Sequence, residues 1–407
     1  MSARRALTWA GRGVAGLVSA ALLAGIGFGW ATYRDAVDDL VTDDVIVADP
    51  SAPDPGPPAP DAPRTDQTIL LVGIDSRTDT HGDPLPQHVL DHLHAGDATG
   101  VRNTDTMIVV HVPADPDRTA FAVSLPRDSY VDIAGGFGRH KLNSAYARAM
   151  NAKADELRAS GAAEAVVERK SRTAGRRNLI ATVNALTGLR VNHYAEINLY
   201  GFSEITKAVG GVPVCLTAPV DDEFSGAEFP AGHQLLAGVD ALKFVRQRHG
   251  LPNGDLDRVR RQQAFLAGLA NRMFSAGTLT DPARVTALVD ALTRSVVLDE
   301  DWDLLGFAQQ VADLSGDRLE FSTIPTGRSN LETPYDGSAV EVDPEEVRAY
   351  FAALLGDQPA KGKPGGDGRA PVREPLAEDR YGITTPAGQG DEGDEEPITA
   401  DGVPCVN

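Results

Sequence analysis

Three short apolar runs constrain the fold of this chain more than any other feature. They are TILLVGID at 68–75, TMIVVHVP at 106–113 and TAFAVSLP at 119–126. The first run is continuous, which is typical of a strand buried on both faces of a sheet. The other two are joined by ADPDR, whose residues favour the turn of a hairpin. We therefore predict a sheet that contains at least one antiparallel pair.

Helical periods alternate with these strands. Residues 178–188 and 255–274 both place apolar side chains on one helical face, and further helices are predicted around 285–297, 303–314 and 344–356. Further strands are predicted at 193–200, 212–216 and 319–325. Because hairpins and crossovers both occur, the predicted fold is an α/β protein, an α-β-α sandwich around a mixed central sheet.

The N-terminal region predicts one transmembrane helix before this domain. Residues 13–33 carry no charge and are long enough to cross a bilayer core of ~30 Å. Arg4, Arg5 and Arg12 precede the run and five aspartates follow it, which predicts a cytoplasmic N-terminus, 1–12, and an extracytoplasmic remainder. A cleaved signal peptide is the alternative, but the run is longer than a typical signal core and lacks a clear cleavage site.

Two further segments have the composition of chain outside a core. Residues 49–63 are rich in Pro, so 34–66 is predicted to be an extracytoplasmic stalk of polyproline II character. Residues 357–407 are rich in Gly, Pro and acid and are predicted to be a disordered tail. The folded domain is then 67–356.

Charge and cysteine content argue against some classes of function and site. A net charge of −20 argues against an extended nucleic-acid surface. Cys215 and Cys405 are too few for a zinc site or a disulfide framework. They could form one disulfide, which an extracytoplasmic location permits and which would tie the end of the tail to the core.

Arginines gather in the stretch KFVRQRHGLPNGDLDRVRRQQ, 243–263, although the protein is acidic. They are Arg246, Arg248, Arg258, Arg260 and Arg261. A guanidinium group presents a planar donor fork that binds phosphate oxygens in pairs. Arg246 and Arg248 share a face if their segment is extended, and Arg258 and Arg261 share one if theirs is helical. The alternative is a solvated basic surface.

Three other charged residues lie at the ends of predicted strands. They are Asp75, Asp105 and Arg127, in GIDSR, RNTDTM and SLPRD. Each one alone is an ordinary polar residue at a strand end. Together, two carboxylates could hold a hard cation such as Mg²⁺, and arginines opposite them could bind the phosphates that complete its coordination.

The order of these motifs resembles the LytR-CpsA-Psr family, of the actinobacterial type. GIDSR, RNTDTM, SLPRD, KLNSAY, the block from NHYAEINLYGF to VGGVPVCL, and the arginine-rich stretch follow one another over most of 68–275. The resemblance implies a phosphotransferase of the cell envelope, which attaches a glycopolymer from a polyprenyl-pyrophosphate carrier to peptidoglycan with Mg²⁺ or Mn²⁺.

The resemblance also implies roles for individual residues. Asp75 and Asp105 would serve the metal. The residues that would hold the pyrophosphate are Arg127, Arg246, Arg248 and Arg258, with Asp255 shaping the site and Gln262 as an extra donor. Catalysis would fall to Asp105, Arg127, Arg246 and Arg248, with Asp105 or a metal-bound water as the base. Arg260 and Arg261 are weaker candidates, and a solvated or structural role for one of them is an equally good interpretation.

Some alternatives stay open at this stage. The segments 76–102 and 151–177 look longer than the family pattern and could change access for the acceptor. A pyrophosphatase acting on the same lipid is a second enzyme hypothesis, and a non-catalytic envelope scaffold or regulator that binds anionic polymer is a third. His140, His193 and His249 lie near motifs, but no catalytic role is assigned to them.

Overall fold

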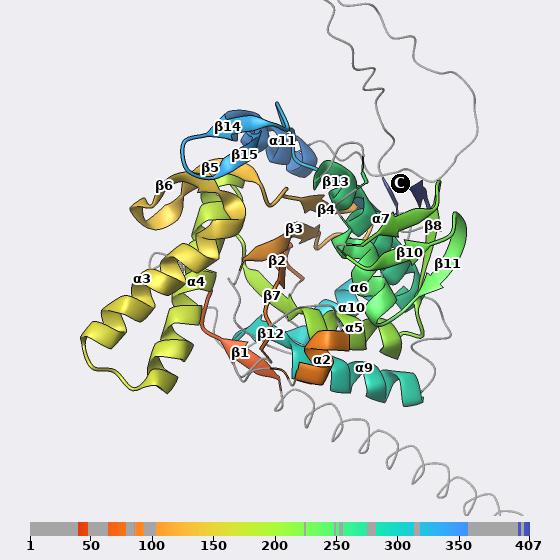
Figure 1. The fold of residues 1–407 in the computed structure, drawn as a ribbon, viewed down its shortest axis with the longest axis horizontal. Coiled ribbons are helices and arrows are strands. Elements are labelled where there is room, and N and C mark those ends of the chain that lie inside the picture. The colour runs from red at the N-terminus through yellow and green to blue at the C-terminus, as the bar shows by residue number, and fades with distance from the viewer. Residues whose placement is uncertain are drawn as a thin grey trace, which may run out of the picture.

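An eight-stranded mixed sheet runs through the centre of the molecule in the computed structural model of the protein (Figure 1). The structure describes residues 40–47, 64–78, 85, 87–92, 103–223, 225–247, 250–251, 255–274, 282–312, 318–356, 398–399 and 403–407. In spatial order the strands are β1 (Val41–Asp43), β12 (Val296–Asp299), β7 (His193–Asn198), β2 (Gln67–Ile74), β3 (Thr104–Val112), β4 (Ala120–Ser124), β13 (Leu319–Thr323) and β16 (Ile398–Thr399). Antiparallel pairs such as β3–β4 and parallel pairs such as β2–β7 both occur, so the predicted mixed sheet is confirmed.

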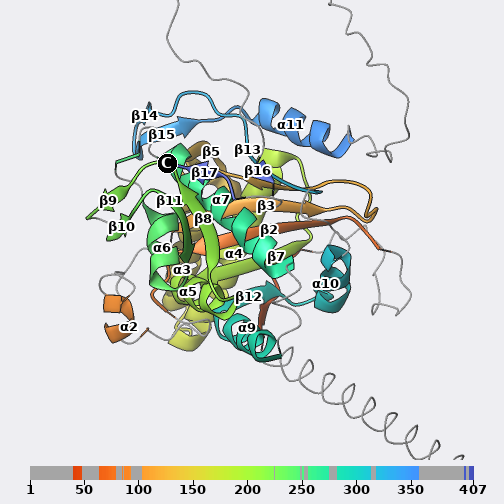
Figure 2. The same cartoon turned by 90° about the vertical axis from the view of Figure 1, so that its right-hand side faces the viewer.

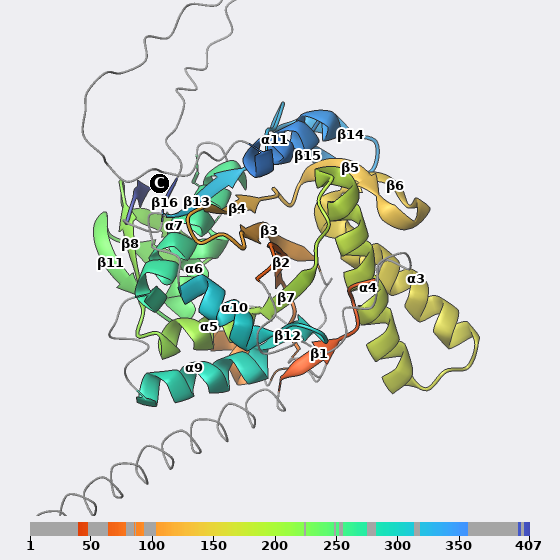
Figure 3. The ribbon, with the colours of Figure 1, turned by 180° about the vertical axis from the view of Figure 1, so that it is seen from behind.

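Helices cover both faces of this sheet. On one side lie α3 (Ala145–Ala159) and α4 (Glu164–Thr187); on the other lie α5 (Leu199–Ala208), α6 (Val239–Arg246), α7 (Asp255–Phe274), α9 (Pro282–Ser295) and α10 (Leu304–Ala312) (Figures 1 and 3). Leu70 and Val72 of β2 pack in the same cluster as Leu179 of α4, whereas Ile69 packs with Trp302 on the opposite face. Burial on both faces explains why the β2 run is continuously apolar.

Smaller elements surround the central sandwich. One sheet has the order β11 (Gly232–Leu236), β8 (Val212–Leu216), β17 (Cys405–Val406); another has the order β14 (Leu331–Thr333), β15 (Gly337–Glu341), β5 (Ser129–Ile133), β6 (Gly138–Lys141); and β9 (Val220–Asp222) pairs with β10 (Ala227–Phe229). Among the described residues, the other α-helices are α2 (Gln87–His92) and α11 (Pro344–Gly356), and two short 3-10 helices are η1 (Ala134–Gly136) and η2 (Leu142–Ser144). These elements extend the fold without interrupting the central sheet.

Two predicted helices differ from the observed ones at a boundary. The helix predicted at 178–188 is the C-terminal part of the longer α4, which ends at Gly188 in a left-handed conformation with φ 72°. The helix predicted around 285–297 ends at Ser295, and Val296 begins strand β12. A short apolar run is compatible with either a helix or a strand. Here the run from Val296 forms a strand because it pairs with β7.

Residues 40–47, which the sequence analysis placed in the stalk, belong to the folded domain. Strand β1 pairs in parallel with β12, and Val45 is buried in the main core. Arg176 of α4 donates to Asp43 Oδ2 over 2.6 Å and to both carboxylate oxygens of Glu196. Burial alone would raise the pKa of Glu196, but Arg176 holds it below its ordinary value. This ion-pair network fixes the segment before the Pro-rich stretch to the sheet.

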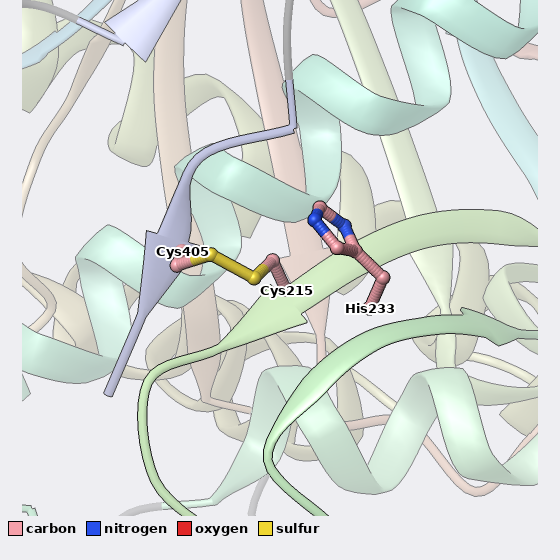
Figure 4. A group of neighbouring side chains, drawn as sticks. All are labelled: Cys215, His233 and Cys405. Atoms are coloured by element: carbon pink, nitrogen blue, oxygen red, sulfur yellow. A yellow bond between two sulfur atoms is a disulfide. The ribbon is translucent and has the colours of Figure 1, made fainter.

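The end of the predicted tail also joins the fold. Cys405 and Cys215 form a disulfide across neighbouring positions of β17 and β8, with their Cα atoms 4.3 Å apart (Figure 4). His233 of β11 lies beside them, and the potential ligand atoms of the three residues fall within 4.8 Å of one another. Since both sulfurs are bonded to each other, neither is available as a thiolate, and this group is a structural staple.

The described helices do not include one with the length and apolar character needed to cross a bilayer. The predicted membrane helix, 13–33, and the predicted cytoplasmic segment, 1–12, lie outside the described residues.

Candidate functional site

A cavity of about 820 Å³ lies between the sheet and the helices α5, α6, α7 and α9. Figure 2 shows α7 crossing in front of β2, β3 and β7. Four charged lining residues lie close together beside the C-terminus of β2: Asp75, Asp105, Arg127 and Arg246. Arg258 and Gln262 of α7 also line the cavity, and Gln262 contacts the residue before Arg246. Elsewhere the walls are mostly apolar: Leu40, Leu71, Ile108, Ala195, Ile197, Leu199, Phe202, Ile205, Leu242, Val245, Phe265, Leu266, Leu269, Leu288, Leu292, Val296, Leu298, Trp302, Leu304 and Phe307. The cavity is therefore amphiphilic along its length.

The two carboxylates meet because β2 and β3 are antiparallel neighbours. Asp75 follows β2, and its backbone N–H donates to Asn103 O over 3.1 Å. In the register, Gly73 pairs with Thr106 and Ile74 with Thr104, so Asp105 is an extra residue on β3. Such a bulge re-aims a side chain. Here Asp105 and its neighbour Thr106 are both half-buried, and both line the cavity.

Arg127 is placed against Asp105 by the loop that follows β4. Arg127 Nη1 donates to Asp105 Oδ1 over 2.5 Å. The Arg127 carbonyl accepts from the Asn143 backbone N–H, and its Nε lies 3.6 Å from Asp128 Oδ1. Lys141 Nζ also approaches Asp128, at 3.3 Å. The guanidinium of Arg127 is thus held between two carboxylates at the mouth of the charged end.

Helices α6 and α7 supply the other cations through their cavity-facing sides. Leu242, Val245 and Arg246 are spaced as one face of α6, and Arg246 is its last residue. On α7 the lining residues are Arg258, Gln262, Phe265, Leu266 and Leu269, again one helical face. Gln262 Nε2 donates to Val245 O over 3.2 Å, so this predicted phosphate donor also ties the two helices together.

Arg261 does not line the cavity, although it is only three residues from Arg258. Its side chain is 1% exposed, and it donates to Gln247 Oε1 and Asn407 O. Its guanidinium carbon lies 5.2 Å from the centre of the Phe244 ring. Burial lowers the pKa of Arg261 to about 10. Arg261 therefore has a structural role, which was the alternative considered for one of the two weaker arginines.

Two predicted site residues cannot be placed. Arg248 lies outside the described residues, and of Asp255 only its position as the first residue of α7 is described. The predicted shared face of Arg246 and Arg248 required an extended segment, whereas Arg246 belongs to helix α6.

The two carboxylates fit a hard divalent cation. Asp75 Oδ1 is buried and has no hydrogen-bond partner among the described residues. Burial, and then the nearby Asp105 carboxylate, raise the pKa of Asp75, while Arg246, Arg77 and Arg127 oppose the shift. A cation held between Asp75 and Asp105 would satisfy the free oxygen and remove their repulsion.

Several polar lining residues and most of the apolar wall were not predicted from the sequence, and the Asp222–Ser225 pair is one example. Asp222 and Ser225 line the cavity, and Ser225 Oγ donates to Asp222 Oδ2 over 2.7 Å. They lie in and beside the short β9–β10 hairpin, where no motif marked them. The apolar lining comes from residues that periodicity assigns simply to a core. His193 contacts Asp299 and Trp302, and His140 contacts Asp336, so both have structural partners.

Comparison with known proteins adds a family relationship. The LytR_cpsA_psr family model matches residues 46–349 of this chain. The cell wall biosynthesis protein LcpA of Corynebacterium glutamicum is 46% identical over 308 residues, which cover 75% of this chain and 59% of that protein. The polyisoprenyl-teichoic acid–peptidoglycan teichoic acid transferase TagU of Enterococcus faecalis is 31% identical over 199 residues, covering 48% and 56%. The chain thus spans less than two thirds of the length of these curated relatives.

The fold is also found in a solved structure. A LytR-Csp2A-Psr enzyme from Actinomyces oris superposes with a TM-score of 0.52 at 17% sequence identity, covering 77% of this chain and 95% of that one. At this identity the likeness concerns the fold alone, and it agrees with the mixed sheet and its two helical layers.

Proposed function

Because this chain belongs to the LytR_cpsA_psr family, we propose that it is a phosphotransferase that attaches a glycopolymer from a polyprenyl-pyrophosphate carrier to peptidoglycan during cell wall assembly. The name of the TagU relative describes the transfer of teichoic acid from a polyisoprenyl carrier to peptidoglycan, which supports this class of reaction. The polymer itself is left open.

The amphiphilic cavity is the observation that carries the proposal. Its charged end presents Arg127, Arg246 and Arg258 next to two carboxylates, and its other walls are apolar. A polyprenyl pyrophosphate has the same division, with an anionic head and a hydrocarbon tail. Binding the head at the arginines and the tail along the apolar walls satisfies both parts of such a ligand.

We assign the cation to Asp75 and Asp105. Mg²⁺ or Mn²⁺ bound there would neutralise charge on the pyrophosphate as the reaction proceeds. The buried, unpartnered oxygen of Asp75 and the neighbouring Asp105 carboxylate are the features that support this assignment.

The proposed reaction is a displacement at phosphorus. The oxygen of a peptidoglycan hydroxyl forms a bond to the phosphorus that carries the polymer, and the bond from that phosphorus to the bridging oxygen breaks. Polyprenyl monophosphate leaves with the electron pair. Arg127, Arg246 and Arg258 stabilise the charge that develops on the phosphate oxygens. Arg248 is a further candidate for this role.

Asp105 is the proposed acceptor of the hydroxyl proton. Its side chain is 33% exposed, so an acceptor that arrives from solvent can reach it. The contact with Arg127 orients the Asp105 carboxylate.

The proposed location follows from the sequence. A membrane anchor at 13–33 would place the domain outside the cell membrane, where the lipid carrier and the peptidoglycan acceptor are both accessible. The disulfide between Cys215 and Cys405 suits such an oxidising compartment.

A reconstituted transfer assay tests the function. The full chain in detergent is incubated with a lipid-linked glycopolymer, a peptidoglycan fragment and Mg²⁺, and polymer transfer is measured. Arg246→Ala should lower transfer at least about hundredfold, since one donor to the developing charge is lost. The control is Arg294→Ala, which removes the same charge from an exposed position on α9. Intact transfer in the Arg246 variant would refute the site.

The same assay separates the alternatives. A pyrophosphatase would release phosphate from the lipid without an acceptor. A binding scaffold would retain the polymer with no Mg²⁺-dependent turnover.

A further inference from the structure

The apolar part of the cavity stops abruptly along the direction of the strands. Leu71 of β2 and Ala195 of β7 line it, but the residues two positions earlier on the same strands, Ile69 and His193, do not. Ile69 is 1% exposed and packs in a cluster with Trp302 and Phe307. Trp302 packs in this cluster and also stacks on His193, and it lines the cavity itself, so its ring lies between the cavity and both positions.

Trp302 is held rigidly in this place. Its Nε1–H donates to Gln67 Oε1 over 3.2 Å, and its ring stacks on His193 with a centroid distance of 4.7 Å and an angle of 13°. The Phe307 ring also packs against it, with a centroid distance of 4.9 Å. An aromatic ring that is held by one hydrogen bond and two ring contacts has little freedom to move, so it can block the extension of a ligand past it.

The residues that hold Trp302 are themselves fixed. His193 Nδ1 lies 3.0 Å from Asp299 Oδ2, and Asp299 Oδ1 accepts from the Tyr194 backbone N–H. Gln67 Nε2 donates to Gln310 Oε1, whose own amide group donates to the carbonyl of Pro113. A second layer of contacts thus prevents the indole from swinging aside.

We propose that Trp302 is a specificity-determining residue, the end wall that limits the length of prenyl chain the cavity can bury. The inference rests on the proposed function, because it assumes that the apolar ligand is the tail of a polyprenyl phosphate. Removing the indole would open the cavity over Ile69 and His193. Two residues along a strand add about 7 Å to its floor.

Binding of polyprenyl monophosphates that differ only in their number of isoprene units tests the proposal. With the full chain in detergent, wild-type affinity should rise with each unit and then level off once the tail reaches Trp302. In Trp302→Ala the levelling point should move to longer chains by at least one unit. For the first chain beyond the wild-type limit, the variant should bind about tenfold more tightly than wild type, since one more unit is buried.

Two further variants control for misfolding and for neighbouring side chains that fill the space left by the indole. Trp302→Phe keeps a ring over His193 and should level off at the wild-type length. Leu71→Phe narrows the cavity before the wall and should level off at a shorter length. All variants are compared for melting temperature.

The outcomes are distinct. A folded Trp302→Ala that levels off at the wild-type length, while Leu71→Phe levels off at a shorter one, would overturn the end-wall inference and leave the proposed function intact. A wild-type protein that binds no polyprenyl phosphate of any length would instead refute the proposed function.

Discussion

Arg127 Nη1 donates to Asp105 Oδ1 over 2.5 Å, joining the loop after β4 to the bulge at the start of β3. One partner of this ion pair is a proposed phosphate ligand and the other a proposed metal ligand. If both assignments hold, Arg127 and the cation would compete for the Asp105 carboxylate until a bound pyrophosphate offered Arg127 other oxygens.

Substitution of Arg127 separates these two effects. Arg127→Ala should lower polymer transfer at least about hundredfold, because a donor to the developing charge is lost. Divalent-cation binding, measured by calorimetry, should be kept or strengthened, since Asp105 is released from its ion pair. Asp105→Asn should lose both. Equal weakening of cation binding in the two variants would contradict the competition.

Asp75 should make stability depend on pH in a defined direction. Burial and Asp105 raise the folded pKa of Asp75, so its contribution to stability is present below its unfolded pKa and is lost as pH rises through the folded value. Without divalent cations, Asp75→Asn should therefore melt higher than wild type at neutral pH. The difference should vanish below about pH 4, near the unfolded pKa.

A cation adds a second readout to the same pair. Mg²⁺ should raise the melting temperature of wild type and leave Asp75→Asn nearly unchanged. Asp290→Asn, an exposed carboxylate on α9, is the matched control and should behave as wild type. A lower melting temperature for Asp75→Asn in cation-free buffer at neutral pH would show that this prediction is wrong.

Substitution of Arg261 should mainly lower stability, whereas substitution of Arg258 should mainly lower activity. Arg261→Ala leaves Gln247 Oε1 and Asn407 O without their donor and should cost about 2–4 kcal/mol of unfolding free energy, measured by denaturant titration. Arg258→Ala should cost less stability and abolish most transfer, because Arg258 lines the cavity. The reverse pattern would exchange their assigned roles.

The disulfide should contribute measurably to stability. It closes a sequence separation of 190 residues, and cross-links of this kind typically contribute about 2–4 kcal/mol. Cys405→Ser should lose that amount in denaturant titration. Reductant should destabilise wild type and have no effect on the variant; an equal effect on both proteins would mean that reductant acts elsewhere.

The charged end of the cavity was predictable because its residues follow strong strand patterns. Asp75 ends a continuous apolar run, and Asp105 and Arg127 flank the two runs that form the predicted hairpin. Adjacent antiparallel strands bring such ends together. The bulge that turns Asp105 into the cavity was not predictable, since a single extra residue leaves no mark in apolar periodicity.

The distinction between the α7 arginines also required the structure. Residues three apart on a helix differ by only about 60° in direction, so the spacing placed Arg258 and Arg261 on one face. That small difference in direction is enough to point Arg258 into the cavity and Arg261 toward Gln247. Trp302 escaped notice for a similar reason, because its role depends on Gln67 and His193, which are distant in sequence.

The position of β1 changes what the Pro-rich stretch can do. Because Asp43 is bonded to Arg176 on the near side of residues 49–63, that stretch links two strands of one sheet and is not a spacer to the membrane. With the proposed anchor ending at Tyr33, the six residues 34–39 would be the whole connection between the anchor and the domain, and six residues span at most about 22 Å. The domain would then stay close to the lipid surface, and the peptidoglycan acceptor would have to approach that surface to be modified.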